Sequence, residues 1–122
     1  MNILNSKILA GITLEVLDDL KGQSICCIDV KTLTSITDYM VIATGRSNTH
    51  VKALADNVVK KVKEVEQEVV GMEGRMQSEW VLVDCGGVVI HIMLAPVRAL
   101  YNLEELWNFE VPKESELKKC KS

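Results

Sequence analysis

The residues of this chain that could perform chemistry are few, and their spacing limits what they can do. The two histidines, His50 and His91, are in neither an H-x-x-H nor an H-E-x-x-H arrangement, and the four cysteines form no C-x-x-C pair. These are the usual spacings of zinc ligands. Adjacent Cys26 and Cys27 lie in an apolar run, which favours two small buried side chains. We therefore expect no metal site, no cofactor and no disulfide framework.

A second candidate is the turn at residues 45–47, Gly-Arg-Ser, which follows an apolar run and precedes a helical pattern. Backbone N–H groups at the start of a helix can bind a phosphate. A single glycine, however, falls short of the glycine-rich phosphate-binding motifs. No two carboxylates are placed together on one strand, and Cys85 has no evident base partner. We interpret the turn as a capped connection and expect no catalytic residues.

Hydrophobic periodicity predicts two amphipathic helices that would position these groups. The first covers residues 6 to about 21, has Asn5 or Ser6 as its N-cap, and ends at Gly22. The second follows Ser47, which is its predicted N-cap, and carries apolar residues at helical spacing from Val51 to Val62.

The remaining apolar runs predict strands at residues 24–30, 38–44, 80–84 and 88–94, and a short edge strand within residues 69–78. Pro96 is expected to close the sheet, and residues 97–107 are expected to form short helical turns. This order predicts an α/β fold: a single-domain sandwich with a mixed four- or five-stranded sheet and helices mainly on one face. We expect the domain to cover residues 1–110 and a polar, flexible tail to cover residues 111–122.

The Gly86-Gly87 pair predicts a two-residue hairpin turn between residues 80–84 and 88–94. This register places an aliphatic set on one sheet face and a mixed set on the other, namely Trp80, Leu82, Asp84, Val89, His91 and Met93. Trp and Met are enriched in protein interfaces. Two interpretations stay open: the mixed face binds a partner, or the C-terminal turns with Tyr101 and Trp107 cover it.

The net and local charges of the chain indicate which kind of partner it could bind. The chain has a net charge of −3 and a pI of about 5.4, which argues against a general nucleic-acid binder. Residues 71–111 carry six acids and two bases, a local charge of −4 that suits a basic protein partner. The longest apolar run has five residues, far fewer than the roughly 20 of a membrane helix, so we expect a cytoplasmic protein with no membrane association.

One stretch resembles the signature of a known family. It consists of residues 35–47, SITDYMVIATGRS, followed by His50-Val51, Ala53 and Ala55-Asp56. Further matches are Glu73-Gly74, residues 80–84, Gly86, residues 88–93, Arg98 and residues 101–107, YNLEELW. Together they resemble the ribosomal silencing factor family RsfS, also called the Iojap family, over most of residues 8–107. Two departures are Gly87, where relatives often carry an acid, and the unmatched tail after Trp107.

The resemblance implies a non-enzymatic translation repressor with a fold similar to the nucleotidyltransferase core. Such a factor binds the large ribosomal subunit through protein fourteen of that subunit, on the intersubunit face, and sterically blocks joining of the small subunit. It also implies a homodimer when free. Two alternatives are a nucleotidyltransferase-like nucleotide-binding enzyme that uses the Gly45 turn, and an interaction domain with a different protein partner.

The mixed sheet face and the family resemblance indicate the same set of partner-binding residues. We expect Trp80 and Met93 to be central anchors, with Leu82 and His91 between them. The polar contacts at the edge are expected to be Glu73, Asp84, Tyr101 and Glu105. Whether His91 contacts the partner or is a packed core histidine stays open.

Overall fold

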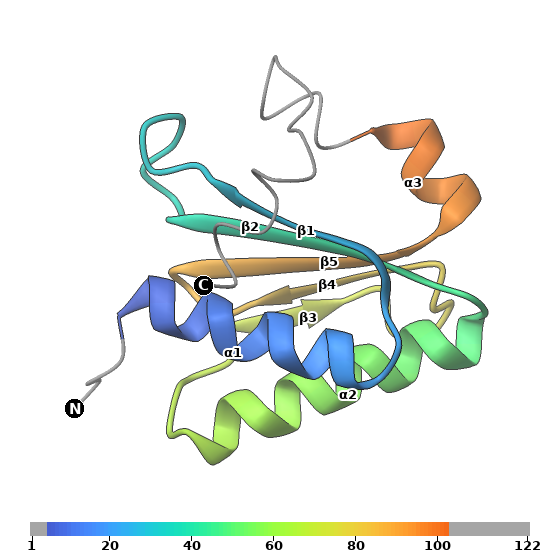
Figure 1. Ribbon diagram of the computed structural model, residues 1–122, viewed down its shortest axis with the longest axis horizontal. Coiled ribbons are helices and arrows are strands. Elements are labelled where there is room, and N and C mark those ends of the chain that lie inside the picture. The colour runs from blue at the N-terminus through green and yellow to red at the C-terminus, as the bar shows by residue number, and fades with distance from the viewer. Residues whose placement is uncertain (1–4, 103–122) are drawn as a thin grey trace.

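The computed structural model describes residues 5–102, which form one mixed five-stranded sheet with three helices (Figure 1). The strand order is β1-β2-β5-β4-β3, where β2 and β5 are parallel and the other neighbours antiparallel. The bounds are β1 Gln23–Asp29, β2 Tyr39–Gly45, β3 Gly71–Glu73, β4 Trp80–Asp84 and β5 Val88–Leu94. The predicted α/β fold is confirmed.

Helices α1 (Ser6–Asp19) and α2 (Asn48–Glu64) lie together on one face of the sheet (Figure 1). The Asn5 side chain caps α1 by accepting a hydrogen bond from the Ile8 N–H, and Ser47 caps α2 by accepting one from the His50 N–H. Both predicted caps are therefore confirmed. α1 is shorter than expected because the chain leaves the helix through Lys21, whose φ is +67°.

The main core lies between these helices and the inner face of the sheet. It includes fully buried side chains from α1, α2 and β5: Leu14, Leu17, Leu54, Val58, Ile90 and Ile92. β2 is buried along its whole length, as expected for a central strand with a parallel neighbour. The inner-face side chains of β4 and β5 belong to this core, so the outer face of these two strands is not covered by α1 or α2.

Helix α3 (Ala95–Tyr101) follows β5 directly and lies on the opposite side of the sheet from α1 and α2 (Figure 1). The last strand ends at Leu94, just before Pro96, as expected, and Pro96 lies in the first turn of α3, where its fixed φ and missing N–H are tolerated. Residues 103–107 of the expected helical turns, and the expected tail at residues 111–122, lie outside the described residues. Within residues 5–102, no helix is long and apolar enough to cross a membrane.

The hairpin between β4 and β5 has the predicted register. Trp80 pairs with Met93, Leu82 with His91 and Asp84 with Val89. The turn is closed by the Cys85 N–H, which donates to the Val88 carbonyl over 2.9 Å, and Gly86 has a φ of +81° that favours glycine. The side chains of the hairpin therefore lie on the two faces of the sheet as predicted.

Candidate protein-binding site

Strand β4 separates the core from the outer surface by strict alternation. Val81 and Val83 are fully buried against the helices, whereas Trp80, Leu82 and Asp84 on the outer face are only partly buried. On β5, Val89 and His91 are also partly buried on that outer face. The sheet thus presents apolar and polar side chains together at its surface, which is the arrangement expected of a binding face.

Trp80 is held in a defined orientation on this face. Its indole Nε1–H donates a hydrogen bond to Nδ1 of His91 over 2.9 Å. Its ring centroid lies 5.8 Å from that of His91 and 4.8 Å from that of Tyr101, which comes from α3. A large aromatic side chain that is already ordered loses little conformational entropy when it binds, which favours a role as an anchor.

His91 serves as the acceptor for this bond in its neutral form. Burial lowers the pKa of His91 to about 4, so the imidazole is uncharged at neutral pH. Because Nδ1 accepts from Trp80, the neutral ring carries its proton on Nε2. His91 is thus partly buried: it orients Trp80 and also lines the surface beside it, and its contact with a partner stays a prediction.

A shallow groove of about 230 Å³ runs beside the indole. It is lined by Glu73, Gly74, Trp80, Leu82 and His91. Gly74 has a φ of +85°, and a Cβ there would collide with the carbonyl of Trp80, so this wall requires glycine. Gly74 is not among the partner-binding residues expected from the sequence, although it follows Glu73 directly in the stretch that resembles the family.

Met93 is not at the surface, and its expected role as an anchor is corrected. Its side chain is 0% exposed, in a second apolar cluster on the outer face of the sheet. This cluster consists of Cys26, Ile28, Val30, Met40, Ile42 and Met93, with Trp80 and Val97 packed against it. β5 is a central strand, so neighbours on both sides and α3 enclose Met93, which supports Trp80 from within.

The expected polar edge is present in part. Glu73 and the nearby Glu79 are exposed, and Tyr101 is 54% exposed. Asp84 is partly buried and accepts a hydrogen bond from the Gly86 N–H, so it also shapes the hairpin turn. Glu105 lies outside the described residues. Of the C-terminal residues expected to cover the face in the alternative interpretation, Tyr101 packs on Trp80, and Trp107 lies outside the described residues. Leu82 and His91 line the groove.

Comparison with known proteins places this chain in a family. The family model described as "RsfS: Ribosomal silencing factor during starvation" matches residues 4–122. A protein of Chromobacterium violaceum named "Ribosomal silencing factor RsfS" is 46% identical over 104 residues, which is 85% of each chain. The chain belongs to the RsfS family.

Solved and more distant relatives agree with this assignment to RsfS. A crystal structure of a Chromobacterium violaceum protein superposes with a TM-score of 0.86 at 42% identity, covering 98% of this chain and 100% of that one. A mouse protein named "Mitochondrial assembly of ribosomal large subunit protein 1" is 38% identical over 89 residues, which is 70% of this chain and 39% of the mouse protein.

In this RsfS-family chain the turn at residues 45–47 is built for packing. The Arg46 N–H donates to His50 Nδ1 over 2.9 Å, and the His50 N–H donates to Ser47 Oγ. A Cβ at Gly45 would press on the backbone of Val51, so the glycine allows α2 to approach β2 closely. His50 Nε2 lies 2.8 Å from the Leu20 carbonyl and connects this turn to the end of α1. These N–H groups are therefore already used within the protein, which disfavours a phosphate site.

The rest of residues 5–102 holds no group of three or more side chains suited to bind a metal ion. Burial and the nearby Asp84 raise the pKa of the Cys85 thiol to about 11, so it is protonated and a weak nucleophile at neutral pH.

Gly87 approaches Ser6 so closely that a Cβ would collide with the serine hydroxyl. At Gly87 the turn therefore packs on the start of α1.

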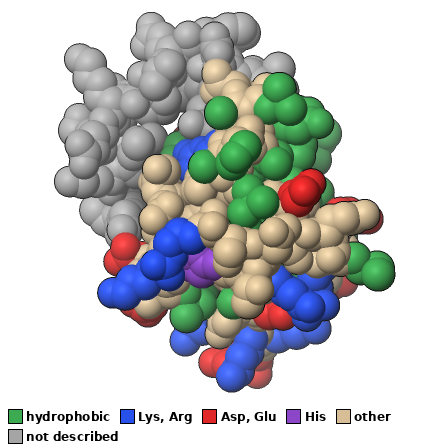
Figure 2. All heavy atoms as spheres, turned by 90° about the vertical axis from the view of Figure 1, so that its right-hand side faces the viewer, with side chains coloured by type: hydrophobic (Ala, Val, Ile, Leu, Met, Phe, Trp, Pro, Cys, Tyr) green, Lys and Arg blue, Asp and Glu red, His purple; other side chains and the backbone are tan. Residues whose placement is uncertain are grey.

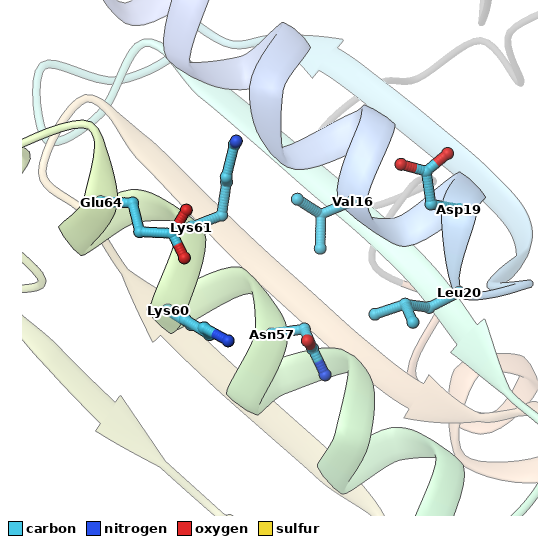
Figure 3. A pocket seen from close by; sticks show the side chains of 7 residues that line it. All are labelled: Val16, Asp19, Leu20, Asn57, Lys60, Lys61 and Glu64. Atoms are coloured by element: carbon cyan, nitrogen blue, oxygen red, sulfur yellow. The ribbon is translucent and has the colours of Figure 1, made fainter.

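A separate hollow of about 250 Å³ lies between α1 and α2 (Figure 3). Val16, Asp19 and Leu20 line it from α1, and Asn57, Lys60, Lys61 and Glu64 line it from α2. The lining mixes aliphatic, amide, acidic and basic groups, so it favours no one class of ligand. The face that carries Trp80 remains the better candidate site.

Proposed function

We propose that this chain is a cytoplasmic ribosomal silencing factor that represses translation without catalysis or a cofactor. It binds the large ribosomal subunit through protein fourteen on the intersubunit face, and its bound volume blocks joining of the small subunit. The main support for the proposal is the position of Trp80. Its indole is partly exposed beside a groove, donates a hydrogen bond to His91 and packs against the Tyr101 ring.

The chemistry of the surface supports a basic protein partner. Trp80 and Leu82 provide an apolar centre. Exposed Glu73 pairs with Leu82 across β3 and β4 and lines the same groove, and exposed Glu79 precedes Trp80 in sequence. An apolar centre surrounded by charge is typical of protein interfaces, where the centre supplies affinity and the charged edge supplies orientation. The resemblance to RsfS implies a basic contact region on the partner, which is complementary.

The names of the relatives support the ribosome as the target. The Chromobacterium violaceum relative is named as a ribosomal silencing factor, and the mouse relative is named for assembly of the ribosomal large subunit. Steric blocking requires only that the bound protein overlap the incoming subunit. An interface of roughly 1,200–2,000 Å² is sufficient to hold a protein of this size in place.

Sedimentation with separated ribosomal subunits tests the proposal. We expect the protein to migrate with large subunits and not with small subunits, and to reduce the fraction of joined ribosomes in proportion to its occupancy. Excess free protein fourteen should compete for the protein and restore joining. Migration with small subunits, or binding that leaves joining intact, would contradict the mechanism.

The same preparation separates the other possibilities. A homodimer of the free protein, which the resemblance implies, would appear as concentration-dependent sedimentation in the absence of ribosomes. An interaction domain with a different partner would bind neither subunit. If the protein binds large subunits but free protein fourteen does not compete, the silencing role stands and the contact protein is another one.

A further inference from the structure

Helix α3 has little hydrophobic burial to hold it in place. It is seven residues long and contains no buried side chain. Figure 2 shows hydrophobic side chains gathered at the surface of the end of the molecule that carries α3, and Leu100 is 77% exposed. Short helices are marginal without tertiary contacts. Among the described residues, the position of α3 on the sheet therefore depends on the packing of partly buried Val97 and on specific side-chain contacts.

Arg98 makes the polar contacts that connect α3 to the far strands. Its Nη1 donates to the Ser24 carbonyl over 2.6 Å and to Oγ1 of Thr44 over 2.9 Å. The pairing of β1 with β2 skips from Gln23 to Cys26, and Ser24 has a φ of +48°. This irregularity leaves Ser24 out of the ladder, so its carbonyl is available to Arg98. Thr44 is buried, and Arg98 is a hydrogen-bond partner of its hydroxyl.

Tyr101 follows Arg98 by three residues on the same helix, a spacing that makes the two side chains neighbours. Arg98 reaches β1 and β2, while the Tyr101 ring reaches Trp80 on β4. α3 thus lies across the outer face of the sheet, where Val97 packs on the second apolar cluster, Arg98 makes the polar contacts described above and Tyr101 makes an aromatic contact. A shift of α3 at the Arg98 attachment would move the Tyr101 ring relative to the indole.

We propose that Arg98 is a positioning residue: it holds α3 so that Tyr101 packs on Trp80, and thereby sets the shape of the partner-binding surface. Its effect on the indole is a property of the free protein. Its effect on ribosome binding rests on the proposed function.

The test labels the protein with 5-fluorotryptophan and records ¹⁹F NMR spectra, with Trp80→Phe to assign the Trp80 resonance. We expect Arg98→Met to shift and broaden this resonance, and Arg98→Lys to restore part of the native signal because an ammonium group can still donate. The matched control is Arg46→Met, which removes the same charge from an exposed arginine and should leave the resonance unchanged.

Two further variants keep the test informative if Arg98→Met folds poorly. Thr44→Val removes one acceptor with little change of shape and should produce a smaller shift in the same direction. Tyr101→Ala should shift the resonance by itself, and adding Arg98→Met to it should change little more, because the arginine acts through the tyrosine. A native Trp80 resonance in folded Arg98→Met and Thr44→Val proteins would overturn the proposal.

Binding to large ribosomal subunits is measured on the same variants. We expect Arg98→Met to weaken binding about threefold to tenfold through loss of preorganisation, with Arg46→Met unchanged. If the native protein does not bind large subunits, the proposed function fails, while the NMR result still decides the role of Arg98. A shifted resonance with unchanged affinity would contradict the part of the proposal that concerns the binding surface.

Discussion

At the scale of single residues, Trp80 and His91 form a unit whose two members have different roles. The indole is partly exposed and oriented for contact, whereas the imidazole is partly buried and uncharged, and it orients the indole through Nδ1. Substitutions at the two positions should therefore have separable effects on partner binding and on stability.

Trp80→Ala should weaken binding to the large subunit by more than about tenfold and leave the fold intact, because an interface anchor typically contributes about 2–4 kcal/mol. Affinity is measured by sedimentation and the fold by circular dichroism. Ile36→Ala is the matched control, because it also removes a large apolar side chain that is 83% exposed, in the loop between β1 and β2. Equal affinities of the native and Trp80→Ala proteins would remove Trp80 from the interface.

The free energy of unfolding should rise with pH between about pH 4 and pH 6.5. The pKa of His91 is about 4 in the folded protein, and an unfolded histidine has a pKa near 6.5, so in this window the unfolded state binds more protons. The full difference corresponds to about 3 kcal/mol, which is lost as the pH falls. His91→Gln, which does not titrate, should flatten this dependence in urea unfolding measured at several pH values. An unchanged slope would show that other groups produce it.

At the scale of elements, the N-cap of α2 positions the turn at residues 45–47, which connects β2 to α2 and was the candidate phosphate site. Ser47 accepts from the His50 N–H, and His50 in turn accepts from the Arg46 N–H, so one cap organises the whole connection. The loop between β3 and β4 is attached to the same helix, because Arg75 forms a two-point ion pair with Asp56 and Asn48 donates to the carbonyls of Gln77 and Ser78. α2 thereby supports one wall of the Trp80 groove.

Ser47→Ala should lower the free energy of unfolding by about 1 kcal/mol, the usual effect of losing a side-chain N-cap. The measurement is a urea titration followed by circular dichroism, with Ser35→Ala as the control because Ser35 is exposed in a loop. If the two variants have the same midpoint, the hydrogen bond of Ser47 does not contribute to the stability of α2.

At the scale of the whole molecule, two helices on one face leave the outer face of β4 and β5 for the proposed binding surface. α3 covers one end of that face and adds the Tyr101 ring to it. The proposed silencing mechanism uses the protein as a rigid obstacle, which suits a sheet whose position is set by a continuous core.

Magnesium and a nucleoside triphosphate should leave the Tm unchanged. A ligand that binds the native state stabilises it by mass action, so a nucleotide-binding enzyme would melt at a higher temperature under these conditions. In this chain the N–H groups of Arg46 and His50 are already hydrogen-bonded. A Tm that rises with nucleotide concentration would revive the enzyme hypothesis.

The sequence by itself determined the local structure of this protein. The Gly86-Gly87 turn and the alternation along residues 80–84 predicted the strand register and both faces. Asn5 or Ser6 predicted the start of the first helix, where Asn5 is the cap, and Ser47 predicted the start of the second. These features follow from the conformational preferences of neighbouring residues, which a sequence displays directly.

Only the tertiary structure decided which residues of the outer face are available. Alternation places Trp80 and Met93 on the same face, but Met93 is buried because it lies on a central strand next to the start of α3. The contact of Arg98 with Ser24 joins residues 74 positions apart, and the bond of Trp80 to His91 requires that β4 and β5 be paired first. Periodicity specifies the side of the sheet that a residue occupies, whereas burial depends on what distant parts of the chain pack against that side.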